Sequence, residues 1–237
     1  MKTRVLISER MDDPSLDLPS HLHALRGLRR INRWTGNAAL AWTPIWDLAR
    51  ELKVNRLRVL DIATGAGDIP IGLWKKSRQY GLQLEIEACD VSRNALEFAA
   101  DNCRQAGAEV RLFPLNVLQD SIIKTYDVVM CSQFLHHLDD SQAQAVLEKM
   151  TACAQHRIVV IDLLRSALNW LQVWVASHAV TRSPVVHFDG PQSVRAAFTV
   201  AEMEAIARRA KLSKFEIRQH WPCRFVFTAR VNKAEEN

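Results

Sequence analysis

The sequence predicts an α/β protein in which a doubly wound sheet of parallel strands is flanked by helices. From about residue 57, short apolar runs alternate with helical patterns, which is the arrangement of parallel strands joined by right-handed crossovers. The run Tyr126–Cys131 is apolar enough for a strand buried on both faces. A length of 237 residues with 48% hydrophobic and 24% charged residues excludes disordered, collagen-like and coiled-coil proteins.

The central part of the chain supplies five strands and their crossover helices. Ser92 is expected to cap one helix and Gly107 to follow it. Another helix is expected to begin near Ser141. The five strands are expected at 58–62, 84–89, 110–115, 126–131 and 157–163.

The two ends of the chain follow a different pattern. Residues 1–19 are expected to be loosely ordered, and helices at 20–34 and up to about residue 52 make residues 1–55 an N-terminal helical cap. Residues 56–237 form the main domain, with a lid insertion at about 165–198. Within the insertion we expect an apolar helix, 166–180, and then a loop with a turn at Asp189-Gly190-Pro191. A helix capped by Thr199 and an antiparallel hairpin, 214–220 and 224–231, complete the chain.

Charge and cysteine content narrow the class of protein. A formal charge of +5 permits an anionic partner without requiring one. The five cysteines are scattered without a Cys-x-x-Cys pair, which is typical of reduced thiols in a cytoplasmic protein and predicts no metal site. The sequence contains neither a signal peptide nor an apolar run long enough to span a membrane.

A glycine-bearing loop and two carboxylates follow the first two strands. Ligands of open parallel sheets bind outside the carboxyl ends of the strands. There, Gly65 and Gly67 allow close approach of the backbone to a ligand, and Asp90 can accept hydrogen bonds from two ribose hydroxyls. These residues predict a nucleoside site.

The sequence around the same loop differs from that of a dinucleotide-binding site. A dinucleotide fingerprint has a third glycine where this chain has Pro70, and neither tyrosine of the chain is followed by lysine at the spacing of a short-chain dehydrogenase. Asp61 ends the first strand; a carboxylate there would repel a pyrophosphate but suit a cationic amine. This points to the amino-acid part of S-adenosylmethionine.

The runs VLDIATGAGD, ACDVS, LFPLNVLQD and YDVVMCSQFLHHLDD resemble class I S-adenosylmethionine-dependent methyltransferases over residues 55–231. The small-molecule branch, which includes ubiquinone- and menaquinone-type enzymes, is most similar. The resemblance implies a Rossmann-like sheet of seven strands in the order 3-2-1-4-5-7-6, with the last strand antiparallel. Two positions depart from the family pattern. Ala63 replaces a glycine, which is tolerable if its φ is negative, and Asn116 replaces an aspartate.

The resemblance also assigns the cofactor to particular positions. Asp61 and the carbonyl of Cys131 would lie near the methionine amine, with Gly65 and Gly67 under the methionine and ribose. Asp90 would bind the ribose, Val91 would pack on the adenine, and Asn116 and Val117 would contact its edge. The cofactor-binding set is therefore Asp61, Ala63, Gly65, Gly67, Asp90, Val91, Asn116, Val117 and Cys131.

Three histidines are candidates for a catalytic base. His136 and His137 follow the fourth strand, although an HHL run there often only packs beside the cofactor. His187 lies in the expected lid loop. Methyl transfer can also proceed without a base, since the sulfonium is already activated and proximity supplies much of the rate. Candidate substrate contacts are Asn32, Arg33, Trp170, Trp174, Asp189 and Arg195.

We expect an enzyme that uses S-adenosylmethionine to methylate a small, apolar or aromatic acceptor, quinone- or polyketide-like, at oxygen or carbon. The alternative is an RNA or protein methyltransferase that docks through the arginines of 26–33, although a solvated helix face explains them as well and we expect no nucleic-acid partner. A binding module without catalysis and a nicotinamide oxidoreductase are further alternatives. Neither the methyl acceptor nor the oligomeric state follows from the sequence.

Overall fold

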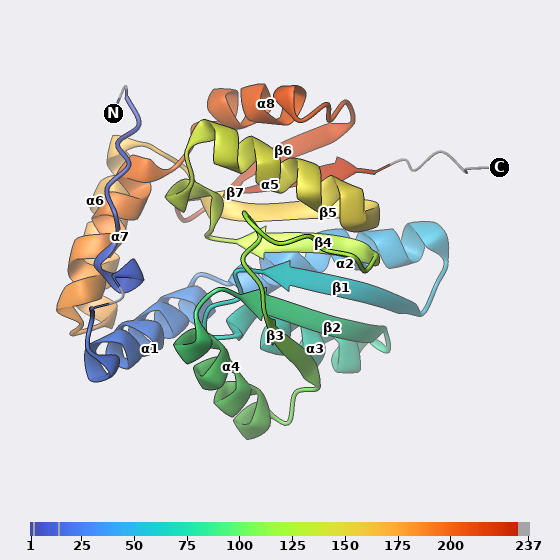
Figure 1. Ribbon diagram of the computed structural model, residues 1–237, viewed down its shortest axis with the longest axis horizontal. Helices are drawn as coiled ribbons and strands as arrows, with labels where there is room; N and C mark the ends of the chain where they lie inside the picture. The colour runs from blue at the N-terminus through green and yellow to red at the C-terminus, as the bar shows by residue number, and fades with distance from the viewer. Residues whose placement is uncertain (2, 14, 232–237) are drawn as a thin grey trace.

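The computed structural model describes residues 1, 3–13 and 15–231 as a single mixed sheet with helices on both faces (Figure 1). The strand order is β3-β2-β1-β4-β5-β7-β6, as the resemblance implied. β7 is antiparallel to β5 and to β6, whereas the other pairs are parallel. The strands are β1 (Arg56–Ile62), β2 (Gln83–Asp90), β3 (Val110–Pro114), β4 (Tyr126–Ser132), β5 (Ala154–Leu163), β6 (Phe215–His220) and β7 (Arg224–Arg230).

The helices begin where side chains satisfy the free N–H groups of their first turn. Ser92 and Thr199 cap their helices as predicted, but the first helix begins earlier than expected because Asp17 accepts a hydrogen bond from the Ser20 N–H at 2.9 Å. The helices are α1 (Leu18–Trp34), α2 (Asn37–Leu52), α3 (Asp68–Tyr80), α4 (Arg93–Ala106), α5 (Asp140–Cys153), α6 (Ala167–Val180), α7 (Pro184–Ala196) and α8 (Val200–Arg209), with short 3-10 helices η1 (Arg10–Asp12) and η2 (Leu135–His137).

Two apolar layers enclose the sheet. On one face, α5 and α8 bury residues such as Leu147 and Met203 against the strands. On the other face, α2 and α3 bury Ile45 and Leu73. α2 therefore packs on the sheet itself, and α1 is the part of residues 1–55 that lies with α6 and α7 beyond the carboxyl ends of the parallel strands (Figure 1).

The loop predicted around Gly190 is wrong, because residues 184–196 form α7. Pro184 occupies the first turn, where its missing N–H costs nothing, and Ser183 caps the helix. Gly190 packs so closely that an added Cβ would lie 3.2 Å from Val173 of α6. The predicted turn at Asp189-Gly190-Pro191 is thus the middle of a helix in which Asp189 is buried.

The N-terminal segment is also more ordered than predicted. Residues 3–13 run along α7 and η2 (Figure 1). Arg4 donates hydrogen bonds to the carbonyls of Leu138 and His136 at 2.6 and 3.1 Å, and its guanidinium lies 3.6 Å from the centre of the Phe198 ring. Within the described residues, no helix combines the length and apolar character that crossing a membrane requires.

Candidate active site

The loop between β1 and α3 contains three residues with left-handed backbone. Ala63, Gly65 and Gly67 have φ values of 56°, 54° and 75°. The expectation of a negative φ at Ala63 is therefore wrong. A Cβ is unfavourable at such a φ, so Ala63 is strained where a glycine would not be.

The two glycines of this loop have different neighbours. An added Cβ at Gly67 would lie 3.1 Å from the Cβ of Ala99 in α4, so Gly67 permits the close packing of the two segments. No atom lies within 4 Å of the position where a Cβ would sit on Gly65. Gly65 thus borders open space, and its backbone remains accessible to a ligand.

Asp90, at the end of β2, lies beside the glycine loop. Its Oδ2 accepts a hydrogen bond from the Gly65 N–H at 2.8 Å, and its Oδ1 accepts one from the Ser92 N–H at 2.9 Å. The carboxylate is thus held in place next to the loop. Val91 follows with 68% of its surface exposed, as suits an apolar side chain that covers a flat ring.

Asp61 is a buried acid without a hydrogen bond. It is 1% exposed, and neither carboxylate oxygen has a hydrogen-bond partner among the described residues. Burial raises the pKa of Asp61 to about 7; the nearby Thr64 hydroxyl opposes this rise, and Asp90 and Asp68 add to it. The Thr64 hydroxyl is also buried and makes no hydrogen bond of normal geometry to the described residues. These orphaned oxygens fit the positively charged amino group of S-adenosylmethionine.

Three further predicted cofactor residues lie at the ends of β3 and β4. Asn116 Oδ1 accepts from the Leu118 N–H at 3.0 Å, which closes a short turn. Val117 is buried in the core below that turn. Cys131 is fully buried between Ile62 and Val160 of the neighbouring strands, so only its backbone can serve a ligand. All five cysteines are buried, and none forms a disulfide with another described residue.

His136 joins the end of β4 to β5 and to the N-terminal segment. Its Nδ1 lies 2.6 Å from Asp162 Oδ1, and its Nε2 lies 3.6 Å from Glu9 Oε1. Burial alone would lower the pKa of His136, but Asp162 and Glu9 together raise it to about 10. Burial would raise the pKa of Glu9, yet His137 and His136 lower it to about 2. The arrangement stabilises an imidazolium between two carboxylates.

The same residues have the donor set of a metal site. The ligand atoms of Glu9, His136 and His137 lie within 4.8 Å of one another. A protonated His136 already pairs with Glu9 and Asp162, because each ring nitrogen faces one carboxylate. The geometry is thus explained by an ion-pair network, and the absence of a metal stays a prediction.

The candidate residues of α7 have contacts of their own. His187 Nε2 donates to the Thr181 carbonyl at 2.8 Å, and its ring stacks on that of His178. Asp189 accepts hydrogen bonds from the N–H groups of residues 10 and 11 at 2.9 and 3.1 Å, which anchors the N-terminal segment. Arg195 Nη1 donates to Gln192 Oε1 at 3.3 Å. The substrate and catalytic roles of His187, Asp189 and Arg195 stay predictions.

An apolar cavity of about 500 Å³ lies between α1, α6, α7 and the β6–β7 link. Leu28 and Ile31 of α1 face Leu171 and Val180 of α6 across it. Gln133, directly after β4, lines the end of the cavity nearest the strands. Trp170 and Trp174 do not line the cavity. Trp170 packs beside Leu163 and Val194, and Trp174 is 44% exposed, with its ring centre 4.7 Å from that of His178.

Asn32 connects this cavity to the glycine loop. Gln133 Nε2 donates to Asn32 Oδ1 at 2.8 Å, and Asn32 Nδ2 donates to Asp68 Oδ2 at 3.2 Å. Asp68 begins α3 directly after Gly67. The predicted residue Asn32 therefore lies between the two candidate sites. The side chain of Arg33 lies outside the described part of the chain.

Several functional candidates were not found from the sequence. Glu9 lies in a segment expected to be loosely ordered, and Gln133 carries no motif apart from its place at a strand end. Pro222 and Cys223 lie in the link of the expected hairpin, and that link forms one wall of the cavity. The cavity residues absent from the prediction include Leu28, Ile31, Thr35, Gln133, Leu171, Trp221, Cys223 and Arg224.

Two of the arginines of α1 contact neighbouring helices. Arg29 Nε lies 3.5 Å from Asp68 Oδ1, and Arg29 also donates to Asn102 of α4. The guanidinium of Arg26 lies 6.0 Å from the Phe98 ring centre. These contacts explain two of the arginines by packing within the protein.

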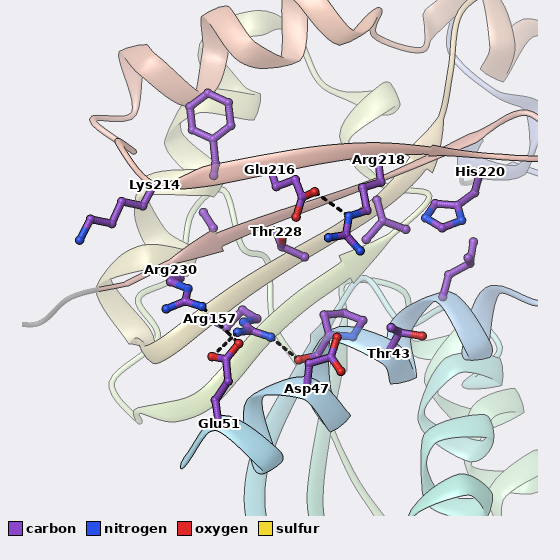
Figure 2. Close-up of a pocket in the computed structure, with 15 residues that line it drawn as sticks. Thr43, Asp47, Glu51, Arg157, Lys214, Glu216, Arg218, His220, Thr228 and Arg230 are labelled. Carbon is purple, nitrogen blue, oxygen red and sulfur yellow. Dashed lines mark hydrogen bonds and ion pairs between the residues drawn. The ribbon is translucent and has the colours of Figure 1, made fainter. Parts of the chain in front are cut away.

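A second groove, of about 560 Å³, lies between α2 and strands β5, β7 and β6 (Figure 2). Its charged side chains pair with one another. Glu51 accepts from Arg157 at 2.9 Å and from Arg230 at 3.2 Å. Arg218 lies 2.6 Å from Glu216. This groove follows the sheet face away from the glycine loop, so we assign it no part in the site.

Comparisons with known proteins agree with this geometry. Residues 59–157 match the family model of a methyltransferase domain. A search of the curated proteins finds no match to the sequence. Among solved structures, the plantazolicin methyltransferase, in complex with a substrate analogue and S-adenosylhomocysteine, superposes with a TM-score of 0.67 at 14% identity over 91% of both chains.

Two further structures share the fold. Magnesium protoporphyrin IX methyltransferase of Synechocystis, with bound S-adenosylhomocysteine, has a TM-score of 0.58 at 16% identity over 94% of this chain and 92% of its own. A Nostoc punctiforme protein described as an O-methyltransferase has a TM-score of 0.64 at 20% identity over 96% of this chain. The present chain spans 64% of the length of that protein. Residues 59–157 thus match a methyltransferase domain, and the fold of the chain is that of solved S-adenosylmethionine-dependent methyltransferases.

Proposed function

We propose that the protein methylates a small, apolar or aromatic acceptor, quinone- or polyketide-like, at oxygen or carbon. The observation that carries this proposal is the apolar cavity between α1, α6 and α7, which is of a size suited to a small organic molecule. Gln133 and Asn32 join the cavity to the first turn of α3, next to the glycine loop. Two adjoining compartments, one for the cofactor and one for an apolar molecule, suit methyl transfer to a small acceptor.

The residues at the strand ends fit S-adenosylmethionine. Asp61 and Thr64 would receive its amino group, Gly65 would pass beneath it, and Asp90 would hold the ribose, with Val91 against the adenine. Bound there, the cofactor supplies a methyl group on a positively charged sulfur. The chain itself binds and orients the two molecules: Gly65 and Ser92 fix Asp90, and α1 lines the apolar cavity while its Asn32 contacts Asp68 of α3.

The named relatives support a small-molecule acceptor by analogy of fold. One was crystallised with a desmethyl-plantazolicin analogue, and the other is named for magnesium protoporphyrin IX. The contacts of Arg26 and Arg29 within the protein weigh against the alternative of docking RNA or protein through α1. Five buried cysteines outside any disulfide among the described residues support a cytoplasmic location.

A cavity-filling variant tests the acceptor site. Ala176→Trp, on the cavity side of α6, should raise KM for phenol or quinol acceptors by about tenfold or more while the Kd for S-adenosylmethionine stays unchanged. Leu168→Trp, at an exposed position of the same helix outside the cavity lining, is the matched control and should behave as wild type. Equal KM values for both variants and the wild type would refute the placement of the acceptor.

A further inference from the structure

Arg224 is a buried cation in the wall of the otherwise apolar cavity. It is the first residue of β7, is 4% exposed, and lies beside Leu163, its partner in β5. Among the described residues that line the cavity, no other carries a charge, and none is an aspartate or glutamate. The positive charge of Arg224 therefore has no counterpart in the cavity wall.

The guanidinium is only partly satisfied by the protein. Nη1 donates to the Pro222 carbonyl at 3.2 Å, and Nε is buried without a hydrogen-bond partner. No salt bridge to Arg224 is found in the described part of the chain, and the nearby Asp162 is already bonded to His136. Burial lowers the pKa of Arg224 to about 10, so the group is still charged at neutral pH.

A buried charge is costly unless a partner of opposite charge and good geometry meets it. The other buried arginines show this pattern. Arg165 lies 2.6 Å from Glu202, and Arg157 lies 2.9 Å from Glu51. Arg224 differs from them in that it borders a cavity instead of a carboxylate. The partner it lacks can come from a ligand in that cavity.

We propose that Arg224 binds an anionic oxygen of the methyl acceptor, so that the acceptor is an apolar molecule carrying an acidic hydroxyl or carboxyl group. The inference rests on the proposed function and specifies its substrate class. Guanidinium groups bind such oxygens strongly through charge-assisted hydrogen bonds. The apolar walls formed by α1 and α6 would hold the remainder of the molecule.

This class of acceptor also removes the need for a base. An enol, phenol or carboxyl group that binds as its anion has already lost its proton, so the chain need not remove one. Its oxygen would form the bond to the methyl carbon while the carbon–sulfur bond of the sulfonium breaks and the electron pair of that bond stays on sulfur, which leaves as the neutral thioether S-adenosylhomocysteine. No histidine is found among the described residues that line the cavity. His136 is held between two carboxylates, and His187 donates its Nε2 proton to a carbonyl. An acceptor bound as its anion accords with these contacts.

Calorimetry with two matched pairs of probes tests the proposal. The first pair is hydroxycoumarin, an acidic enol, and its methyl ether; the second is decanoic acid and methyl decanoate. The wild type should bind the acidic member of at least one pair about tenfold or more tightly than the neutral member. The pair that shows the preference distinguishes an enol or phenol from a carboxylate as the recognised group.

Substitutions assign the preference to Arg224. Arg224→Met should abolish it without weakening the neutral probes, and Arg224→Lys should retain part of it. Arg218→Met, an exposed arginine of the same hairpin that pairs with Glu216, is the control and should retain all of it. Unchanged S-adenosylmethionine binding and unfolding temperature show that each variant is folded.

Two results would overturn the inference: equal affinity of the wild type for acidic and neutral probes, or a preference that survives in Arg224→Met. The experiments distinguish a failure of this inference from a failure of the proposed function. If the Arg224-dependent preference is found but no acidic apolar molecule is methylated, the anion site stands and the assigned reaction is wrong. If neutral acceptors are methylated equally by wild type and Arg224→Met, the reaction stands and the role of Arg224 is wrong.

Discussion

His136 is bonded to Asp162 at two points: its ring Nδ1 lies 2.6 Å from Oδ1, and its backbone N–H donates to Oδ2 at 3.1 Å. Asp162 belongs to β5 and His136 follows β4, so the pair fixes the ends of two central strands. Glu9 meets the opposite ring nitrogen and brings the N-terminal segment to the same place. The N-terminal segment, which covers the site, is thereby held against the sheet by ion pairs.

Glu9→Gln should destabilise the protein by about 2 kcal/mol near pH 6, because it removes one carboxylate from a buried imidazolium. The pKa of His136 is raised to about 10 in the folded state, above its ordinary 6.5. The stabilisation is therefore complete below about pH 6.5 and is lost as pH rises toward 10. Urea unfolding at several pH values should show the difference between wild type and variant shrinking over that range.

Glu148→Gln, an exposed change on α5, is the control and should alter stability little at any pH. Equal stability of Glu9→Gln and the wild type near pH 6 would contradict the ion-pair network.

Asp61→Asn should stabilise the protein without cofactor and weaken cofactor binding. Burial raises the pKa of Asp61 to about 7, so folded protein binds this proton more tightly than unfolded protein. The wild type therefore loses stability as pH rises from about 4 to about 7. The neutral amide of Asp61→Asn does not titrate, so at pH 8 the variant should be more stable than the wild type by roughly 1 kcal/mol or more. Thermal unfolding measures the gain, and calorimetry should show weaker binding of S-adenosylmethionine.

The wild type should also bind S-adenosylmethionine more tightly as pH rises through about 7, because ionised Asp61 attracts the ligand amine. Asp61→Asn should lose that dependence. An identical pH dependence in the two proteins would exclude Asp61 as the partner of the amine.

Ala63→Gly should stabilise the protein by roughly 0.5–1 kcal/mol. The φ of 56° costs alanine about 1–2 kcal/mol, and the greater freedom of glycine in the unfolded chain offsets part of the gain. Ala66→Gly in the same loop is the control, since Ala66 has no positive φ and is buried, and it should destabilise. If both changes destabilise equally, Ala63 is not strained.

The elements that sequence analysis predicted well have local causes. Alternating apolar runs predicted the strands, and Ser92, Thr199 and Gly107 marked helix ends because caps act on neighbouring residues. Gly65, Gly67 and Asp90 lie at two successive strand ends, so the topology of a parallel sheet was enough to bring them together.

The elements that were missed depend on contacts between distant segments. Pro184 and Gly190 are typical of loops, but packing of α7 against α6 decides their structure. Glu9 meets His136 from a segment whose composition predicts disorder. The cavity joins α1, α6 and the β6–β7 link, and no local pattern places Arg224 in its wall.

The central claim is that the glycine loop and Asp90 together bind S-adenosylmethionine. Isothermal titration of the cofactor into Asp90→Ala tests it, with Asp101→Ala on the exposed side of α4 as the control. Loss of the carboxylate removes the expected ribose contacts and the acceptor of the Gly65 N–H, so the Kd should rise by about tenfold or more for Asp90→Ala alone. Binding of S-adenosylmethionine by Asp90→Ala as tightly as by the wild type would contradict the account.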